Sequence, residues 1–447
     1  MTAEGAAMGA RRCGWLYSVR GKRFGQIQRS PDTKGDKGDA APVSGAGAVA
    51  AVAALAVIVF LLGGAPTAAT AQVRDVVVGY LAWEDDPRYD PDRMEDGFPL
   101  HPAARPLPGA KLGLEEASFA LQAHGLKAGL DAVEVADLDG ARSKLDEWTA
   151  AGVPAIITDL PADWVVALAR HGQAQGERAP LLFNATAIDD GLRGADCHPR
   201  VFHVTPNQRM RADAIAQLLG ARRWSRVLVL QGPEPADQEM GKAYTASLRK
   251  FGLKTVATRP FKLSNDPRER DLGNVALLTA NADYDAVLVI DADGEFAREV
   301  PFRTVLPRPV LGSDGVVAQT WHPRFERFGA PQLSRRFVKA NGRPMSDWDW
   351  STWMSAKAIA HALVESRDQS PTALRELLRS DKTILDGFKG SRLGFRPWDQ
   401  QLRQPVFLGY GSGIAGMAPF EGFLHQKDVL DTLGFDQPES ACKGLVK

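Results

Sequence analysis

Short apolar runs rich in β-branched residues alternate with amphipathic stretches along most of this sequence. The run Val76–Leu81 is followed by apolar residues at helical spacing over 109–124, and similar runs occur at 155–158 and 201–204. Such runs predict buried parallel strands, and the stretches between them predict helices that cover both faces of the sheet. The alternation therefore predicts an α/β protein.

A second block with the same alternation begins after Pro206. We expect a helix over 207–219 with Asn207 as its N-cap, and strands at 226–230 and 286–290. A chain of 447 residues exceeds the size of one ordinary core. The two blocks therefore predict two doubly wound parallel-sheet lobes around a ligand cleft.

The rest of the chain is expected to complete these two lobes. The later elements expected are helices at 350–365 and 371–378 and a hairpin of 393–395 with 406–410. The expected boundaries are 1–71 for a signal peptide, 72–205 plus about 333–390 for lobe 1, 206–332 plus about 391–420 for lobe 2, and 421–447 for a tail that returns to lobe 1.

The N-terminal residues have the order of a secretory signal. Eight Lys and Arg precede residue 38, an uncharged apolar run of 15 residues spans 48–62, and small residues end at Ala71. The run is shorter than the roughly 20 residues of a membrane span. We expect cleavage after Ala71 and export to the periplasm, with an uncleaved membrane anchor as the alternative.

Cysteine usage and charge agree with export. After Ala71 two cysteines are left, Cys197 and Cys442, and in an oxidising compartment such a pair predicts a disulfide; two unrelated thiols are the alternative. Beyond residue 71 the chain carries 46 basic and 50 acidic side chains, which does not suggest a nucleic-acid partner. Zinc-binding spacings are absent from the sequence.

One glycine-rich motif is set aside. Residues 411–416 fit the dinucleotide fingerprint, but that fingerprint requires a helix to follow at once, and Pro419 disfavours one. We interpret the motif as a turn. The sequence also contains neither a nucleophile elbow nor a Walker loop, so it does not indicate an enzyme, although a periplasmic hydrolase or dehydrogenase is kept as a rival hypothesis.

Polar residues follow the expected strands at their carboxyl ends. Ligands of doubly wound sheets bind at this edge, where loops and helix N-termini meet. The candidate ligand-binding residues at these ends are Trp83, Thr158, Asp159, Ala185, Thr186, Asp291, Asp293 and Asp314. Arg88 and Trp321, in expected loops, are added because of the ligand chemistry given below.

The segment from Asn184-Ala185-Thr186 to Val201–Pro206, followed by a helix, resembles type I periplasmic binding proteins of the branched-chain amino-acid-binding kind. The resemblance implies a small-molecule receptor that works with an inner-membrane ABC permease. It also implies ligand contacts from the Ala-Thr pair and from Thr158, Asp293 and Asp314. We expect a monomer. This chain has Pro233-Glu234-Pro235 where a tyrosine is common in the family, which argues against an amino-acid ligand.

A narrower resemblance lies in the first loop and near the end of the chain. Trp83–Pro91, Arg105–Ala110, Leu430–Gly434 and Pro438–Cys442 are similar to binding proteins encoded beside quinoprotein alcohol dehydrogenases. This resemblance implies a link to periplasmic alcohol oxidation. It implies a ligand such as pyrroloquinoline quinone or a lanthanide ion, and a ligand sensor is an alternative to transport.

The chemistry of the two ligands ranks them. The quinone is a flat tricarboxylate that favours aromatic faces and guanidinium groups. Candidates for those contacts are Trp83, Trp321, Trp348, Trp350, Arg88, Arg93, Arg193 and Arg324. A lanthanide favours several carboxylates in one loop, by analogy with calcium. Those carboxylates would be Glu84, Asp85, Asp86, Asp90 and Asp92, with Arg88 and Arg93 interleaved. We expect the quinone as a bound ligand, no catalytic cofactor and no metal site.

Overall fold

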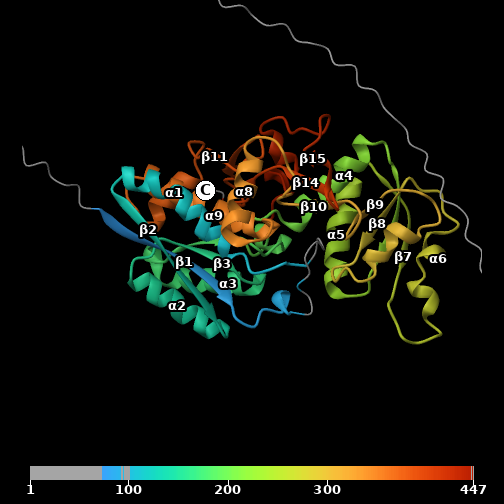
Figure 1. Cartoon of the computed structure of the whole chain (residues 1–447), viewed down its shortest axis with the longest axis horizontal. Coiled ribbons are helices and arrows are strands. Elements are labelled where there is room, and N and C mark those ends of the chain that lie inside the picture. The colour runs from blue at the N-terminus through green and yellow to red at the C-terminus, as the bar shows by residue number, and fades with distance from the viewer. Residues whose placement is uncertain (1–72, 92–93, 95–100, 444, 446–447) are drawn as a thin grey trace, which may run out of the picture. The chain divides into compact units, whose positions relative to one another are not determined.

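The structure of the chain is a computed structural model, which describes residues 73–91, 94, 101–443 and 445. Residues 1–69 and 70–447 form separate units, and the description below concerns the second unit (Figure 1). The expected signal peptide, together with Asp92 and Arg93, lies outside the described residues. No described helix has the length and apolarity needed to cross a bilayer.

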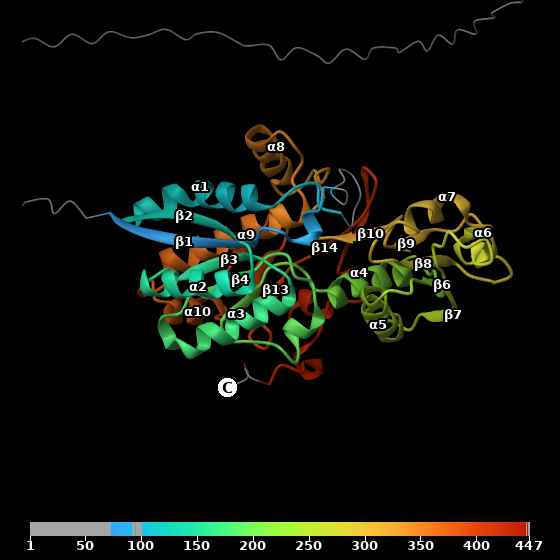
Figure 2. The same cartoon turned by 90° about the horizontal axis from the view of Figure 1, so that it is seen from below.

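Lobe 1 is built on a five-stranded parallel sheet in the order β2-β1-β3-β4-β5. Its strands are β1 (Arg74–Trp83), β2 (Leu126–Val135), β3 (Ala155–Asp159), β4 (Leu181–Asn184) and β5 (Val201–His203). One face packs on α1 (Leu107–Ala123) and α9 (Asp347–Glu365), and the other packs on α2 (Leu138–Ala150) and α3 (Ala162–Ala174), as Figure 2 shows.

Lobe 2 is built on a four-stranded parallel sheet in the order β7-β6-β8-β9. Its strands are β6 (Arg226–Gln231), β7 (Lys254–Pro260), β8 (Ala286–Ile290) and β9 (Val310–Gly312). The helices α4 (Gln208–Ala221) and α5 (Pro235–Lys250) cover one face, and α6 (Val275–Thr279) and α7 (Val300–Arg303) lie on the other. The predicted α/β fold of two parallel-sheet lobes is confirmed.

The remaining elements lie between and beside these sheets. They are β10 (Val317–Gln319), α8 (Ala330–Asn341), α10 (Pro371–Leu378), β11 (Leu385–Asp386), β12 (Arg392–Phe395), β13 (Leu402–Arg403), β14 (Val406–Tyr410) and β15 (Gly413–Ala418). The 3-10 helices are η1 (Pro87–Tyr89), η2 (Gly176–Arg178), η3 (Asp190–Arg193), η4 (Arg270–Gly273), η5 (Ala297–Glu299), η6 (Val429–Thr432) and η7 (Gln437–Glu439).

The expected hairpin of 393–395 with 406–410 is wrong. Strand β12 pairs with β11 and β13, whereas β14 pairs with β10 and β15. Leu393 and Phe395 pack in the same apolar cluster as the first sheet, so this part of the segment 391–420 belongs with lobe 1 and not with lobe 2. Because 393–395 and 406–410 are short strands close in sequence, local pairing was expected. Strand β12 instead packs against β5 through Phe395 and Phe202, which keeps it away from β14.

The glycine-rich motif is a turn, as expected. Gly411 has a φ of +47° and lies between β14 and β15, and the chain continues as a strand. A left-handed φ is accessible to glycine at no steric cost. Strand β15 takes the place, among the described residues, of the helix at which the fingerprint would bind a pyrophosphate.

Close packing of α1 on α9 depends on two glycines one helical turn apart. A Cβ at Gly113 would lie 2.6 Å from the carbonyl oxygen of Trp353 and 2.8 Å from Cβ of Ala356, and a Cβ at Gly109 would overlap the backbone of Asp349. Only a residue without a Cβ lets the two helix backbones approach this closely.

Between residues 101 and 443 the chain passes between the lobes three times. The passes follow β5, β10 and β13, and buried polar side chains hold the first and the last. Arg193 Nη2 and Gln401 Nε2 donate to the carbonyl oxygen of Thr205 at 2.8 and 3.1 Å, and Lys389 Nζ donates to Gln404 Oε1 at 2.7 Å. These bonds satisfy backbone and side-chain groups that lie away from water.

The disulfide predicted from cysteine parity is present. Cys197 and Cys442 are bonded, with Cα atoms 5.6 Å apart across 245 residues of sequence. The bond joins the end of the chain to lobe 1, between η3 and β5.

Candidate functional site

The carboxylate of Asp159, the last residue of β3, is the centre of a polar cluster at the carboxyl end of the first sheet. The side chain is fully buried. It accepts hydrogen bonds from the hydroxyls of Tyr89 at 2.8 Å and Tyr80 at 3.2 Å, and from Arg88 Nη2 at 3.1 Å. Tyr80 reaches it from β1 because Ala82 pairs with Asp159, which places Tyr80 on the same face.

A short 3-10 turn brings Arg88 to this acid. Asp86 caps η1 by accepting from the backbone N–H of Arg88 at 2.9 Å, and its carboxylate also pairs with the guanidinium at 2.6 Å. Pro87 at the first position fixes φ for the turn. Arg88 is therefore fastened between Asp86 and Asp159, and its charge is neutralised inside the protein.

Burial and charge act against one another in this cluster. Burial raises the pKa of Asp159, and the Arg88 cation and the Tyr89 hydroxyl oppose that rise. Burial would lower the pKa of Arg88, but Asp159 and the hydrogen bond to Asp86 outweigh it and raise that pKa. Burial and the neighbouring Asp159 raise the pKa of Tyr89, so its hydroxyl stays protonated.

Half-buried indole rings lie on both faces of this sheet edge: Trp83 and Trp164 pack with α2 and α3, on the face opposite Tyr80, and Trp348 lies beside the cluster. Trp83, at the end of β1, stacks on Trp164 of α3 with ring centroids 5.0 Å apart and an angle of 28°. Trp348 meets the ring of Tyr89 edge-on at 5.7 Å, and the guanidinium of Arg88 lies 5.1 Å from the centroid of Trp348. Partly exposed aromatic faces at a strand end suit a flat ligand.

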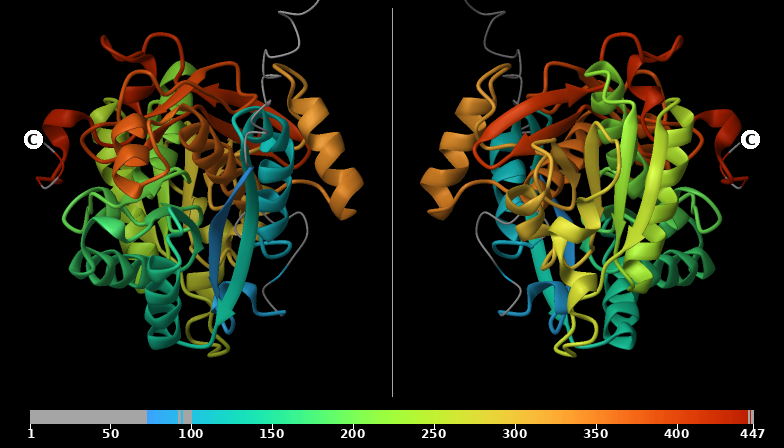
Figure 3. Two further views of the ribbon diagram at one scale, coloured as in Figure 1. Left: turned by 90° about the vertical axis from the view of Figure 1, so that its left-hand side faces the viewer. Right: turned by 90° about the vertical axis from the view of Figure 1, so that its right-hand side faces the viewer.

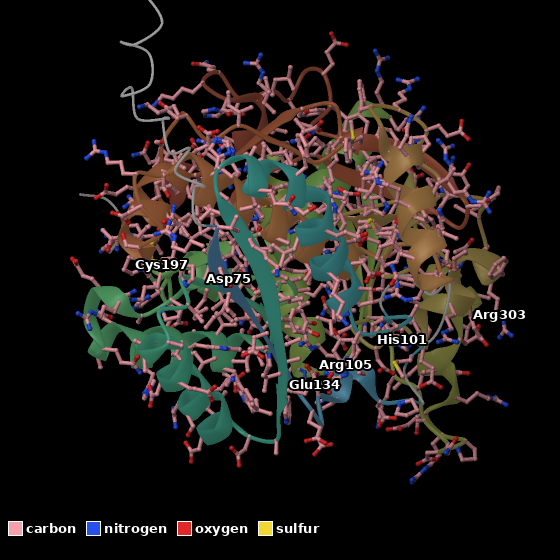
Figure 4. All side chains as sticks on the ribbon, turned by 60° about the vertical axis from the view of Figure 1, so that its left-hand side comes forward. Asp75, His101, Arg105, Glu134, Cys197 and Arg303 are labelled. Atoms are coloured by element: carbon pink, nitrogen blue, oxygen red, sulfur yellow. A yellow bond between two sulfur atoms is a disulfide. The ribbon has the colours of Figure 1, made fainter. Side chains whose placement is uncertain are left out.

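Arg105 supports the first loop from the start of α1. It donates to the carbonyl oxygen of Trp83 at 2.8 Å, lies over the ring of Tyr89 at 4.7 Å, and approaches Glu134 at 4.0 Å (Figure 4). Its donors are thus directed to backbone carbonyls, which makes Arg105 a support for the loop that carries Trp83.

The end of β4 presents a buried hydroxyl beside Asp159. The backbone N–H of Ala185 donates to Thr158 O at 3.2 Å, and Thr158 Oγ1 donates to Phe183 O at 3.3 Å. The hydroxyl of Thr186 is buried and has no hydrogen-bond partner among the described residues. It approaches Asp159 closely enough to lower that carboxyl pKa without making a hydrogen bond of ordinary geometry. With Asp159 as its one neighbour of this kind among the described residues, the hydroxyl has capacity to bond a ligand as well.

The carboxyl ends of the second sheet are acidic. Asp291 accepts from the N–H of Ala297 at 2.9 Å, and its own N–H donates to Ser313 Oγ at 2.9 Å. Burial raises the pKa of Asp291. Asp314 accepts from the N–H of Gly315 within the loop after β9.

The segment Pro233–Pro235 starts helix α5. Glu234 is the N-cap, and Asp237 closes the capping box by accepting from the Glu234 N–H at 2.9 Å. The other oxygen of Asp237 accepts from Ala292 N–H at 2.6 Å, which ties the start of α5 to the loop after β8. Asp237 thus fixes the backbone of the loops that follow β6 and β8, by accepting from one N–H group in each.

The structure therefore brings most of the expected site residues into two groups. Trp83, Arg88, Thr158, Asp159, Ala185 and Thr186 lie at the end of the first sheet, and Asp291, Asp293 and Asp314 lie at the end of the second. Trp321 lies apart from both groups. It is buried in the core of lobe 1, with its ring parallel to that of Trp350 at 6.4 Å.

Two further expectations about arginine need correction. Arg88 does not offer a free guanidinium, because Asp86 and Asp159 occupy it. Arg193 is fully buried and holds the carbonyl oxygens of Ala187 and Thr205. Arg88 therefore positions carboxylates and Arg193 positions backbone carbonyls. Their location in polar loops of the sequence did not indicate these roles.

Residues that the sequence did not single out complete the cluster. Tyr80, Tyr89 and Arg105 contribute the remaining rings and donors, and Trp164 packs on Trp83 at the other face of the sheet. Tyr80 lies within an apolar strand and Trp164 within an amphipathic helix, so periodicity assigns both to the core. The alternative lanthanide cage is not seen among the described residues, where no group of three His, Cys, Asp or Glu is placed to hold a metal ion.

Two surface hollows lie elsewhere, between β7 and α6. Their empty volumes are about 460 and 720 Å³, and they are lined by residues such as Lys262 and Glu269 of the loop and Leu277 of α6. None of the expected site residues contributes to either hollow. They are open surface features of lobe 2 and are separate from the strand ends.

Comparison with known proteins identifies the kind of fold. Residues 109–299 match the model of a family described as periplasmic binding protein. A branched-chain amino-acid ABC transporter periplasmic ligand-binding protein from Burkholderia xenovorans LB400 is 14% identical with a TM-score of 0.63, and the match covers 82% of this chain and 99% of that protein.

Two further solved structures show the same likeness. A leucine-, isoleucine-, valine-, threonine- and alanine-binding protein from Brucella ovis is 15% identical with a TM-score of 0.61, covering 78% of this chain and 95% of that one. An ABC transporter substrate-binding protein from Desulfitobacterium hafniense in complex with Leu is 16% identical with a TM-score of 0.59, covering 76% and 99%. None of the curated proteins compared matches the sequence.

Proposed function

We propose that this chain, which has the fold of the type I periplasmic binding proteins and matches their family over residues 109–299, is the solute-binding subunit of an ABC importer. It binds a small ligand between strand ends in the periplasm and delivers it to an inner-membrane permease. The proposed binding residues are those of the two strand-end groups, and the protein is not an enzyme. The observation that carries the proposal is the buried hydroxyl of Thr186 beside Asp159, at the strand-end edge where doubly wound sheets bind ligands.

Pyrroloquinoline quinone is the first candidate ligand. The half-buried indole of Trp348 beside Tyr89 offers a face for a flat ring, and the stacked pair of Trp83 and Trp164 lies at the same strand end on the other face of the sheet. Because Arg88 is already paired, the carboxylates of the quinone have to be met by hydroxyl and backbone donors at the strand ends, Thr186 among them. The link to alcohol oxidation rests on the similarity of the first loop and of the C-terminal end to binding proteins of quinoprotein systems.

An amino-acid-like solute is the second candidate. Its support is the acidic edge of lobe 2, where Asp291, Asp293 and Asp314 favour a ligand that carries an amino group. Several structural neighbours are described as binding amino acids. The start of α5 at Pro233–Pro235 argues against it, because no aromatic side chain is supplied there.

Thermal unfolding of the purified chain with each solute tests the proposal. The candidate ligand raises the free energy of unfolding by about 2.7 kcal/mol at a hundredfold excess over its dissociation constant. Thr186→Val reduces the affinity by about 1–3 kcal/mol, since the ligand loses its buried partner. Thr149→Val on α2, whose hydroxyl bonds Leu145 O at 2.8 Å, is the matched control and leaves affinity unchanged.

The outcomes separate the candidates. A shift with the quinone and none with leucine supports the first, and the reverse supports the second. A shift with a lanthanide salt alone assigns the ligand to the carboxylates of the first loop. Stimulation of ATP hydrolysis by a reconstituted permease distinguishes a transport role from a sensor, and turnover of any solute by the purified chain would overturn the receptor proposal.

A further inference from the structure

Residues 428–442, which we call the C-terminal strap, bind lobe 2 through helices α4 and α5. The backbone N–H of Gly434 donates to Asp213 Oδ2 at 2.9 Å, and Lys250 Nζ donates to the carbonyl oxygens of Thr432 and Gly434, each at 3.1 Å. Asp213 is fully buried and also pairs with Lys250 at 3.0 Å. Leu433 of the strap packs in the apolar cluster of α4 and α5.

The same strap binds lobe 1 through a buried carboxylate. Asp431 accepts from Arg396 Nε at 2.9 Å and from Arg403 Nε at 2.8 Å. Asp431 is 3% exposed and Arg396 is 1% exposed. Both arginines belong to the β12–β13 segment, where Phe395 contacts Phe202 of β5 at 4.9 Å between centroids.

A covalent bond then closes the strap on lobe 1, because Cys442 is joined to Cys197. The strap is therefore a fourth connection between the lobes, in addition to the three passes of the chain. It contacts lobe 2 at α4 and α5, and Figure 3 shows the red C-terminal segment on the side opposite to the orange helix α8.

We infer that the strap limits how far the lobes separate and keeps the edge between α4 and β13 together when no ligand is bound. Separation along this edge has to break the Asp431 pairs or the contacts of Asp213 and Lys250. Separating a buried charge from its partner is strongly unfavourable. The lobes therefore separate at the edge that lies away from the strap. That edge is where His101 meets Asp293, well apart from Cys197 in Figure 4.

The strap thereby positions the two strand-end groups for capture of a solute. This role rests on the proposed receptor function, but its test needs no ligand. The full chain, purified from an oxidising compartment, is compared with Asp431→Asn and with the double variant Cys197→Ser/Cys442→Ser. Hydrogen exchange of the passes at 204–207 and 404–406 and the radius of gyration from small-angle scattering are measured without solute.

We expect exchange in both passes to rise about tenfold in each variant, with a larger radius of gyration, because opening no longer meets the restraint. Glu421→Gln, an exposed residue ahead of the strap, is the matched control and leaves both readouts unchanged. Reduced wild-type chain, with loss of the disulfide verified by mass, gives the same comparison if a variant does not fold.

Faster exchange confined to 428–442, with an unchanged radius of gyration, would overturn the inference, since the strap would then be a passive attachment. A chain that binds none of the solutes tested can still show the expected change. Failure of the receptor proposal and failure of the strap are thus separate results.

Discussion

His101 Nε2 lies 2.8 Å from the carbonyl oxygen of Asp293, and this hydrogen bond joins the segment before α1 in lobe 1 to the loop after β8 in lobe 2. A carbonyl oxygen only accepts, so the imidazole donates through Nε2–H. The contact spans the two groups of expected site residues. It is therefore placed to hold the lobes together at the strand ends.

His101→Ala is expected to release bound solute about fivefold faster, because one hydrogen bond of about 1 kcal/mol between the lobes is lost. Stopped-flow fluorescence of the Trp residues measures the release. His124→Ala at the end of α1 is the matched control, since that imidazole bonds Ala120 O within lobe 1. Equal release rates for wild type and His101→Ala would contradict a holding role for the bond.

Arg88→Ala is expected to lower the free energy of unfolding by about 3 kcal/mol, because it leaves Asp159 and Asp86 buried without their cation. Arg142→Ala removes an exposed i,i+3 pair with Asp139 and should change stability by under about 0.5 kcal/mol. Urea unfolding followed by circular dichroism compares the two. A loss of ligand affinity with no loss of stability would instead assign Arg88 to direct ligand contact.

Gly113→Ala is expected to destabilise by about 2 kcal/mol, although alanine favours a helix, because its Cβ would meet the carbonyl oxygen of Trp353 at 2.6 Å. Gly129→Ala in β2 is the control, since a Cβ there meets nothing within 4 Å. Thermal melts of both variants provide the test. Equal melting temperatures would show that α1 and α9 adjust their spacing freely.

Asp190 predicts a pH dependence of stability. Burial raises the pKa of Asp190 to about 6, although the Arg209 N–H and the Arg193 cation each act to lower it. The unfolded carboxyl ionises at about pH 4, so between about pH 4 and 6 the folded state holds more protons and stability falls as pH rises. Above pH 6 the full loss, up to about 3 kcal/mol, is present.

Asp190→Asn should therefore remove this slope and be more stable than wild type at pH 7. Its side-chain oxygen can still accept from the N–H of Arg209, as Asp190 Oδ1 does at 2.9 Å. Asp189→Asn, at an exposed neighbouring position, should retain the slope. Unfolding by urea at a series of pH values measures both. A slope unchanged in Asp190→Asn would assign it to another group.

Local pattern was enough to predict the elements and the fold class. Apolar runs at β1, β3 and β8 and helical spacing at α1, α4 and α9 follow from residues close in sequence, and the Asn207 cap is seen, with Oδ1 accepting from Met210 N–H at 3.1 Å. Cysteine parity predicted the bond between Cys197 and Cys442 because only one pairing existed.

The arrangement of the candidate site was predicted in outline only. The topology of a parallel sheet places strand ends at one edge, so Thr158, Asp159 and Thr186 were expected together. The structure shows in addition that Arg88 pairs with Asp159 and that Trp321 lies in the core. Both results depend on contacts between segments far apart in sequence. Composition and residue spacing do not show which carboxylate a given arginine will pair with in the folded protein.

What the sequence by itself determined is the alternation of strands and helices, two lobes and one cysteine pair, because each follows from periodicity or counting over nearby residues. Only the tertiary structure decided that β12 joins lobe 1, that the strap at Asp431 bridges both lobes, and that Asp159 lies beneath Tyr80 and Tyr89. These relationships arise when buried charges and rings find partners across hundreds of residues, and burial makes those partners obligatory.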